Sequence, residues 1–285
     1  MTERTHKTAL VLAGGGSLGA VQVGMLAALM RAEVEVDLVV GSSVGALNAS
    51  FFAANPSAEG VGELAEIWRH LRRRDIFPVN LGAALRWLRL SEGLLDSSGL
   101  RSLIERHLPY RNLEEAKIPI HMVATNLGGQ TVRLSRGPAV EAILASAAIP
   151  MIFPMVEIEH RHLMDGAVSG NTPILTAAEL GATRIVVLPT GFACALEQPP
   201  AGAAARGIHA LTLLVAHQMA RDLARLAGTV EIYTAPSLCP LAVSPFDFSL
   251  TESLIARAEE RTHAWIDAGG LSRQEIPSSL LAHSH

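Results

Sequence analysis

The stretch that decides the fold is Val36-Asp37-Leu38-Val39-Val40-Gly41-Ser42-Ser43-Val44-Gly45-Ala46-Leu47-Asn48-Ala49. Its first part, residues 36–40, is a short and mostly aliphatic run, which is typical of a strand buried inside a sheet. Two glycines then surround Ser43, and residues 46–49 favour a helix. The stretch therefore predicts a strand, a sharp turn and a helix in direct succession.

The same succession occurs once more, at the start of the chain. Residues 8–13 form an aliphatic run that predicts a first buried strand, and Gly14-Gly15-Gly16 interrupts it. Ser17 is the expected N-cap of a helix over residues 18–31. This strand–helix–strand–helix order predicts a parallel sheet with crossover helices.

Further segments continue the α/β pattern. Expected strands cover residues 119–125, 130–134, 156–158, 162–164, 184–188 and 230–234. Expected helices cover residues 58–74, 79–90, 97–107, 140–146, 173–180, 207–227 and 250–268. Gly128-Gly129 predicts a hairpin turn between the first two of these strands, and a second hairpin is expected between residues 156–158 and 162–164.

Length and composition favour a single globular domain. The chain has 285 residues, of which 49% are hydrophobic and 18% are charged, so it is too apolar for a disordered protein. We expect one α/β domain over residues 8–270, followed by a polar tail over residues 271–285. Residues 76–95 are a candidate lid or insertion, because their helical block interrupts the alternation of strands and helices.

Charge and cysteine content exclude several classes of function. The formal net charge is −4, so the chain has no overall field that would favour nucleic acid. Cys194 and Cys239 lie far apart and in no metal-ligand spacing, which favours a reducing compartment and no metal site. No run reaches the ~18 apolar residues of a membrane span, and no signal peptide is recognisable. We therefore expect a cytoplasmic protein.

Gly41-x-Ser43-x-Gly45 matches the nucleophile elbow of serine hydrolases, in which a serine lies on a sharp strand-to-helix turn. Glycines on both sides relieve crowding in such a turn, and the strained backbone exposes the serine hydroxyl above the sheet. The N-terminus of the following helix offers amide donors for an oxyanion. The alternative is a glycine-flanked turn whose serine only caps a helix.

The glycine-rich block Gly14-Gly15-Gly16-Ser17-Leu18-Gly19 allows two interpretations. Gly14-x-Gly16-x-x-Gly19 fits the dinucleotide fingerprint of an oxidoreductase, which also requires an acidic residue at the end of the second strand. Asp37 stands at the start of that strand instead. Alternatively, three glycines before a helix form an oxyanion hole that faces the same crevice as Ser43.

A serine nucleophile needs a base, and two kinds of residue are candidates. His209, His217 and His263 have the chain order of a Ser–acid–His carboxylesterase but no other distinguishing feature. Asp165, which is followed by a glycine, lies 165 − 43 = 122 residues after Ser43. On its own, an Asp-Gly pair is simply a turn dipeptide.

Four blocks of sequence, in this order, resemble the patatin-like phospholipases. They are Gly14-Gly15-Gly16-Ser17-Leu18-Gly19, Gly41-Ser42-Ser43-Val44-Gly45-Ala46-Leu47-Asn48-Ala49, Ala145-Ser146-Ala147-Ala148-Ile149-Pro150 and Asp165-Gly166-Ala167. The resemblance covers residues 8–174, and four ordered blocks are much more specific than any one of them. It implies an α/β fold of three layers with a mainly parallel central sheet.

The resemblance also implies a Ser–Asp dyad instead of a triad. It makes Ser43 the nucleophile and Asp165 its base. The implied oxyanion hole consists of Gly14, Gly15 and Gly16. The glycines that support the same motifs are Gly19, Gly41, Gly45 and Gly166. The implied reaction is the hydrolysis of fatty-acyl esters of lipids, which needs neither a metal nor an organic cofactor.

One position departs from the family pattern. The family usually has a basic residue where this chain has Leu18, which puts in doubt a cationic side chain near the oxyanion or the lipid headgroup. Backbone donors do not depend on that side chain, so we expect activity to be retained.

Apolar side chains near the candidate lid indicate where the protein could meet lipid. The expected helix over residues 79–90 carries Trp87 beside Arg86, a combination found in helices that lie on membrane surfaces. A transient membrane-surface contact is therefore expected, with packing on the protein's own core as the alternative. Met151, Phe153 and Met155 are candidates for an acyl pocket or for the core.

Overall fold

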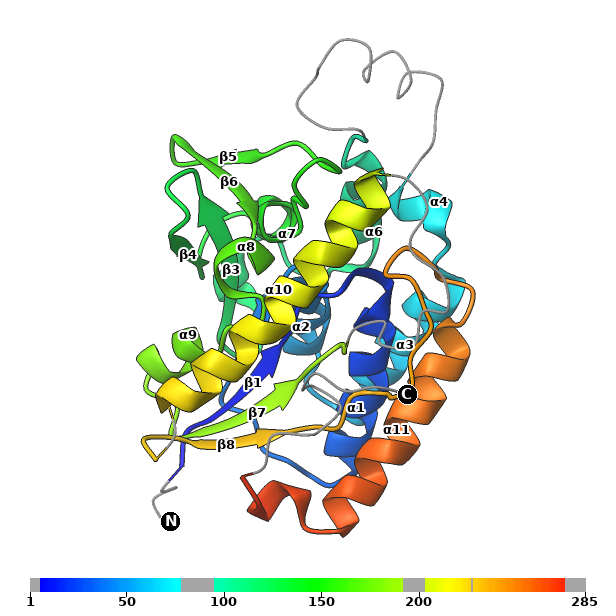
Figure 1. The fold of residues 1–285 in the computed structure, drawn as a ribbon, viewed down its shortest axis with the longest axis vertical. Coiled ribbons are helices and arrows are strands. Elements are labelled where there is room, and N and C mark those ends of the chain that lie inside the picture. Colours follow the sequence, from blue (N-terminus) through cyan, green and yellow to red (C-terminus); the bar gives the residue numbers. More distant parts are fainter. Residues whose placement is uncertain (1–5, 78–94, 192–202, 227, 275–285) are drawn as a thin grey trace.

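A central sheet of eight strands organises the protein (Figure 1). The computed structural model describes residues 6–77, 95–191, 203–226 and 228–274. The strands are β1 (Thr8–Leu12), β2 (Leu38–Ser42), β3 (Ile120–Asn126), β4 (Thr131–Leu134), β5 (Val156–Ile158), β6 (Arg161–Asp165), β7 (Arg184–Leu188) and β8 (Glu231–Thr234). Their order across the sheet is β5-β6-β3-β2-β1-β7-β8, and β4 pairs with β3 in addition.

The five strands β8, β7, β1, β2 and β3 are mutually parallel, whereas β4, β5 and β6 join the sheet antiparallel. All residues of β1 and β2 are buried, as expected for aliphatic strands covered on both faces. The two predicted hairpins, β3–β4 and β5–β6, are confirmed. In the first of them Gly129 has a φ of 77°, which explains the glycine at that turn.

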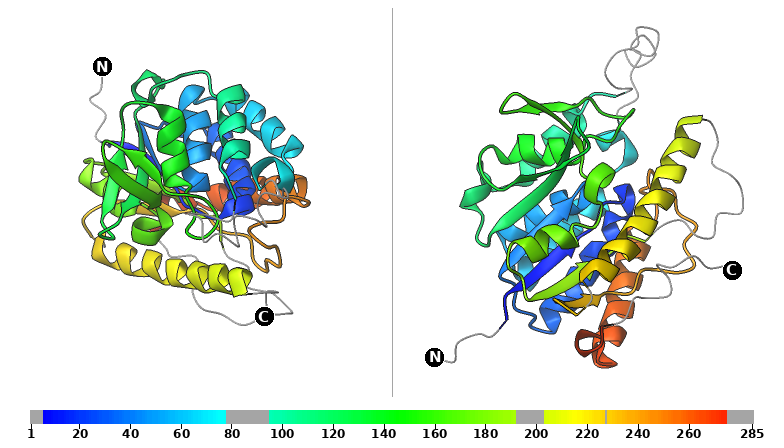
Figure 2. Two further views of the ribbon diagram at one scale, coloured as in Figure 1. Left: turned by 90° about the horizontal axis from the view of Figure 1, so that it is seen from above. Right: turned by 60° about the vertical axis from the view of Figure 1, so that its left-hand side comes forward.

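Helices cover both faces of this sheet (Figure 2). They are α1 (Gly19–Arg31), α2 (Val44–Ala54), α3 (Ala58–His70), α4 (Arg73–Ile76), α6 (Ser98–His107), α7 (Ala139–Ser146), α8 (Ala167–Gly170), α9 (Ile174–Glu179), α10 (Ala203–Leu226) and α11 (Thr251–Asp267). Short 3₁₀ turns occupy Gly16–Leu18, Leu113–Glu115 and Gly270–Ser272. Within the described ranges, no helix combines the length and the apolar character needed to cross a bilayer.

Alternate residues of β1 divide the core into two layers. Leu10 and Leu12 pack into a large cluster with side chains of α1, α2, α3, α6, α7 and α11. Ala9 and Val11 point to the other face, where they meet side chains of α9 and α10. Because successive side chains of a strand point to opposite faces, a fully apolar strand needs helices on both sides. The structure is therefore an α/β sandwich of three layers with a mainly parallel central sheet, as predicted.

Three predictions about the ends of elements are corrected by side-chain hydrogen bonds. The helix expected over residues 58–74 ends at His70, because Leu71 and Arg72 are extended and the Asp75 carboxylate accepts the Arg72 N–H at 2.8 Å to start α4. Ser17 is not an N-cap, since its hydroxyl donates to the carbonyl of Ser244 at 3.1 Å. The second strand begins at Leu38 and not at residue 36, because the Asp37 carboxylate accepts the Thr8 N–H at 2.7 Å.

Part of the predicted organisation lies outside the described residues. This holds for the amphipathic helix over residues 79–90, including Arg86 and Trp87, and for most of the candidate lid over residues 76–95. The polar tail over residues 271–285 is described only as far as residue 274. Phe77, at the edge of the candidate lid, is buried in the core.

The edge of β3 that faces away from β4 pairs with two strands, β2 and β6, which meet there end to end. β4 pairs with residues 122–125 of β3, so β2 and β6 must share the opposite edge. β2 pairs with residues 120–123, where Ser42 lies opposite Val123, and β6 continues along residues 124–126, where Asp165 lies opposite Ala124. The carboxyl ends of β2 and β6 therefore meet at the middle of β3.

A buried polar network fixes the helices behind this junction. Asn48 on α2 donates from Nδ2 to the Gly19 carbonyl at 3.0 Å and to Gln22 Oε1 at 2.9 Å, and its Oδ1 accepts the Trp68 indole N–H at 2.8 Å. Gln22 in turn donates to the carbonyls of Ala13 and Leu188. The network joins α1, α2 and α3 to the ends of β1 and β7 without an unpaired amide group.

Replacement of this buried amide tests the importance of the network. We expect Asn48→Ala to lower the free energy of unfolding by about 2–4 kcal/mol, because the Trp68 N–H and Gln22 Oε1 lose their partner in a dry interior. Asn112→Ala is the matched control, since the only described partner of the Asn112 side chain is Glu115 at the surface, and it should change stability by no more than about 0.5 kcal/mol. Equal urea midpoints for the two variants would contradict the prediction.

Candidate active site

Ser43 occupies the turn between β2 and α2 in a strained conformation. Its φ is 55° and its ψ is −126°, a region that residues with a side chain rarely adopt and that costs about 1–3 kcal/mol. The flanking glycines are packed against backbone: a Cβ on Gly41 would lie 2.4 Å from the Gly45 carbonyl oxygen, and one on Gly45 would lie 2.2 Å from that of Leu12. This packing explains why the turn needs glycine at both positions.

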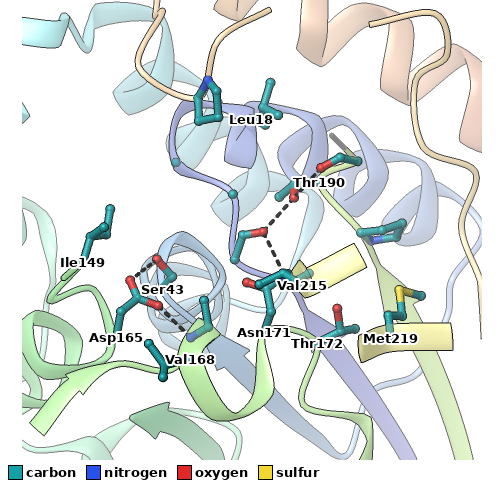
Figure 3. Close-up of a pocket in the computed structure, with 18 of the residues that line it drawn as sticks. Leu18, Ser43, Ile149, Asp165, Val168, Asn171, Thr172, Thr190, Val215 and Met219 are labelled. Atoms are coloured by element: carbon teal, nitrogen blue, oxygen red, sulfur yellow. Dashed lines mark hydrogen bonds between the residues drawn. The ribbon is translucent and has the colours of Figure 1, made fainter. Parts of the chain in front are cut away.

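Asp165, at the end of β6, faces Ser43 directly (Figure 3). The Ser43 hydroxyl donates to Asp165 Oδ2 at 2.7 Å, and the Ala167 N–H donates to Asp165 Oδ1 at 2.7 Å. Both side chains are buried, with Asp165 only 2% exposed. The structure thus brings together two predicted site residues that are 122 positions apart, and it gives each carboxylate oxygen one donor.

Burial shifts the acidity of this carboxyl group. Removal from water raises the pKa of Asp165 to about 6, and the hydrogen bonds from Ser43 and Ala167 offset part of that rise. Asp165 is therefore still mainly ionised at pH 7. It is also a stronger proton acceptor than an aspartate exposed to water.

Ser146 holds the junction between the two strands. Its hydroxyl accepts the Ser43 N–H at 3.0 Å and donates to the Val123 carbonyl at 2.6 Å, and its own carbonyl accepts the Gly166 N–H at 3.1 Å. The side chain is fully buried at the end of α7. Sequence reasoning assigned no role to this serine, although it lies inside one of the four diagnostic blocks.

The glycine loop after β1 approaches the same point. A Cβ on Gly14 would lie 3.0 Å from the Ser43 Cβ, so the loop and the serine are in contact. The Gly14 N–H donates to the Asn171 carbonyl at 3.1 Å, so it is not free for an oxyanion, contrary to the prediction for all three glycines. Among the described residues, the N–H groups of Gly15 and Gly16 have no acceptor.

A mainly apolar cavity of ≈ 110 Å³ opens beside Ser43 on the side of α10 (Figure 3). Its polar lining comes from Asp165, Asn171, Thr172, Thr190 and the glycine loop. Its apolar lining includes Leu18, Ile149, Val168, Val215, Met219, Pro245 and Phe246. Leu18, which replaces the basic residue of the family pattern, is buried and contributes to this lining.

A second cavity, of ≈ 50 Å³, also reaches Ser43. Its lining is almost entirely apolar and includes Trp68, Phe77, Phe153 and Phe248. The rings of Phe77 and Phe153 are stacked with centroids 5.6 Å apart, so these aromatic walls support one another. Ser43 lines both cavities. Met151 and Met155, the other two candidates for an acyl pocket, are exposed and line neither cavity.

Histidine does not complete a triad in the part of the site that the structure describes. Neither cavity that contains Ser43 is lined by a described histidine. His263 lies on α11, half exposed, with its Nδ1 3.1 Å from Asp267 Oδ2. His209 lies on α10 outside both linings, and the side chain of His217 is not among those described. The described side chains also contain no cluster of His, Cys, Asp or Glu able to hold a metal ion.

The dinucleotide interpretation also fails on geometry. The acidic residue that it needs should lie beside the glycine loop, at the carboxyl end of the second strand. Asp37 instead binds the Thr8 N–H at the opposite end of β1 and β2. The position that a ribose-binding acid would occupy is taken by the Ser43 turn.

Comparison with known proteins supports the resemblance. The family model described as patatin-like phospholipase matches residues 10–178. A patatin-like phospholipase domain-containing protein of Caenorhabditis elegans is 28% identical over 188 residues, which make up 64% of this chain and 17% of that protein. Human patatin-like phospholipase domain-containing protein 6 is 28% identical over 186 residues, 64% of this chain and 13% of that protein. The chain thus spans less than a fifth of the length of these two relatives.

Among solved structures, human GIVD cytosolic phospholipase A2 in complex with methyl gamma-linolenyl fluorophosphonate is similar in fold. The TM-score is 0.50 at 13% sequence identity, with 96% of this chain and 59% of that chain covered. At this identity the likeness concerns the arrangement of strands and helices.

The hydrogen bonds of Ser146 generate a prediction about the reactivity of Ser43. We expect Ser146→Ala to slow the reaction of Ser43 with a fluorophosphonate by about tenfold or more, because the buried Ser43 N–H and Val123 carbonyl lose their partner and the strained turn relaxes. The rate is measured by mass spectrometry of labelled protein.

Ser50→Ala is the matched control for this measurement. Ser50 is equally buried, but among the described residues its hydroxyl bonds only the carbonyl of Ala46 within α2. Its labelling rate should stay within about twofold of the unmodified protein, since only a local helix bond is lost. Equal rates for the two variants would argue against a special role of Ser146.

Proposed function

The chain belongs to the patatin-like phospholipase family, and on that basis we propose that it is a serine lipid acyl hydrolase that cleaves fatty-acyl esters. Ser43 is the proposed nucleophile and Asp165 its general base. The observation that carries this proposal is the 2.7 Å hydrogen bond from the Ser43 hydroxyl to Asp165 Oδ2 inside a buried, mainly apolar site.

The first step forms an acyl-enzyme. Asp165 Oδ2 accepts the hydroxyl proton of Ser43 while Ser43 Oγ attacks the carbonyl carbon of the ester. A pKa of about 6 suits this role, because the carboxylate is ionised at neutral pH and yet binds a proton readily. The Ala167 N–H holds Oδ1, which leaves Oδ2 aimed at the serine.

The negative oxygen of the tetrahedral intermediate needs donors. The N–H groups of Gly15 and Gly16 are the proposed donors, since both are without an acceptor among the described residues and lie on the loop that contacts Ser43. A well-placed donor of this kind contributes about 3–4 kcal/mol to transition-state stabilisation. Gly14 contributes by contact and not by donation.

Collapse of the intermediate and hydrolysis complete the cycle. The proton on Asp165 passes to the departing alkoxide, and the C–O bond of the ester breaks. A water molecule then gives a proton to Asp165 and attacks the acyl-enzyme, after which the proton returns to Ser43 Oγ as the fatty acid is released. The same carboxylate thus serves both halves of the reaction.

The two cavities at Ser43 suggest how an ester is bound. The acyl chain is proposed to enter the aromatic cavity around Phe153, where each buried methylene is worth about 0.8 kcal/mol. The alcohol part is proposed to lie in the cavity toward α10, which offers polar groups such as the hydroxyl of Thr172. Val168 lines that cavity and is 39% exposed, so it is a candidate for transient contact with a lipid surface.

Removal of either dyad group tests the proposed function. We expect Ser43→Ala to lower hydrolysis of p-nitrophenyl acyl esters at least about a thousandfold and to abolish fluorophosphonate labelling, because the hydroxyl that bonds the Asp165 carboxylate is removed. Asp165→Asn should cause a comparable loss of turnover with the fold intact, checked by circular dichroism.

Ser42→Ala is the control for both variants. Ser42 is buried next to Ser43, but its hydroxyl has no hydrogen-bond partner among the described atoms. Activity should therefore stay within about threefold of the unmodified enzyme. Hydrolysis that persists in Ser43→Ala, or a label on another residue, would refute the proposed chemistry.

The acidity of Asp165 predicts the pH dependence of the reaction. Its pKa is raised to about 6, so the carboxylate is lost as the pH falls through 6 and the enzyme loses its base. We expect kcat/KM to be nearly constant above pH 7 and to drop about tenfold for each pH unit below 6. An acidic limb near pH 4, typical of an aspartate in water, would contradict this assignment.

A further inference from the structure

The carbonyl oxygen of Gly14 is held by two side chains from other parts of the fold (Figure 3). The Thr190 hydroxyl, just after β7, donates to it at 2.7 Å, and Asn171 Nδ2, just after α8, donates at 3.4 Å. Both side chains are buried, with exposed fractions of 3% for Thr190 and 8% for Asn171. Together with the bond from the Gly14 N–H to the Asn171 carbonyl, these contacts fix both polar groups of Gly14.

These contacts also determine where the next N–H group points. The Gly14–Gly15 peptide is planar and trans, so the Gly14 carbonyl and the Gly15 N–H point in opposite directions. Thr190 lies across the glycine loop from Ser43 (Figure 3), whereas the Asn171 side chain approaches Gly14 from the same side as Ser43. The short bond from the Thr190 hydroxyl to the Gly14 oxygen therefore turns the Gly15 N–H toward the side of Ser43.

A glycine peptide needs such a restraint. Glycine has access to both signs of φ, so an unrestrained Gly-Gly peptide can rotate and carry its N–H away from a bound ester. Thr190 opposes this rotation in a second way, because its side chain fills the space beside Gly15: a Cβ there would lie 2.2 Å from Thr190 Oγ1. The hydroxyl also has a weaker contact of 3.3 Å to the Gly191 carbonyl.

We propose that Thr190 and Asn171 are positioning residues of the oxyanion hole, which hold the Gly14–Gly15 peptide with its N–H aimed at the ester carbonyl oxygen. The inference rests on the proposed function, in which Gly15 is an oxyanion donor. Neither side chain takes part in proton transfer. Their effect falls on the tetrahedral intermediate and its flanking transition states, where negative charge develops, and not on the binding of the neutral ester.

The test uses Thr190→Val, which keeps the shape of the side chain and removes its hydroxyl. It separates an effect on the oxyanion from an effect on the binding of the neutral ester. Three quantities are measured: kcat and KM for a p-nitrophenyl ester, Ki for a trifluoromethyl ketone of the same chain length, and Ki for the corresponding secondary alcohol. The ketone forms a tetrahedral oxyanion adduct with a nucleophilic serine, whereas the alcohol cannot.

We expect kcat to fall and the Ki of the ketone to rise by a similar factor, about tenfold or more, while KM and the Ki of the alcohol change by less than about twofold. Thr190→Ser restores the hydroxyl and should recover most of both losses. Thr262→Val is the matched control, because it makes the same change to a buried threonine of α11 whose hydroxyl has no partner among the described residues.

Asn171→Leu provides a second, independent arm. It keeps the approximate side-chain shape and the backbone bonds and removes the donor at the Gly14 oxygen without adding a charge, so the same selective loss is expected if Thr190→Val does not fold. An unchanged kcat in a folded Thr190→Val or Asn171→Leu enzyme, or equal changes for ketone and alcohol, would overturn the positioning role. Failure of the proposed function looks different, since Ser43→Ala would then retain hydrolysis whatever the other variants do.

Discussion

Backbone N–H and C=O groups on the edge of a buried strand must be paired. On one edge of β3 they are paired by two strands that follow one another along that edge. Its first residues pair with β2 and its last residues with β6, so the two strands stop head to head. One strand runs parallel to β3 and the other antiparallel, which is why both present their carboxyl ends at the gap. The meeting of Ser43 and Asp165 follows from this pairing, and the hydroxyl of Ser146 fills the remaining space between the ends.

Burial of that junction has linked consequences for chemistry. It raises the pKa of Asp165 toward neutrality, and it leaves the strained Ser43 turn dependent on hydrogen bonds from neighbouring elements. It also leaves Ser43 in the lining of two mainly apolar cavities. The same apolar surroundings strengthen any hydrogen bond to an oxyanion, because a low local dielectric screens charge weakly.

Local patterns in the sequence predicted most of the fold, but contacts between distant segments were not predictable from one sequence. The strand over Arg184–Leu188 agrees to the residue, because an aliphatic run between turn residues needs no partner to be recognised. The capping role of Ser17 was wrong, since its hydroxyl bonds Ser244, which lies 227 positions away. The bond from Thr190 to Gly14, 176 positions away, and the bridging role of Ser146 were not predictable for the same reason. Contacts of this kind produce no periodic pattern in the sequence.

The cavity toward α10 is lined by two portions of the chain, of which the family model matches only the first. Ser43, Asp165 and the glycine loop lie within residues 10–178, where the family model matches, whereas Thr190, Val215, Met219, Pro245 and Phe246 lie beyond it. The proposed reacting groups thus lie in the first portion, whereas the second portion supplies part of the cavity wall. Changes in the second portion can alter the shape of the cavity without replacing a proposed reacting group, except at Thr190, where a wall residue of the cavity also bonds the glycine loop.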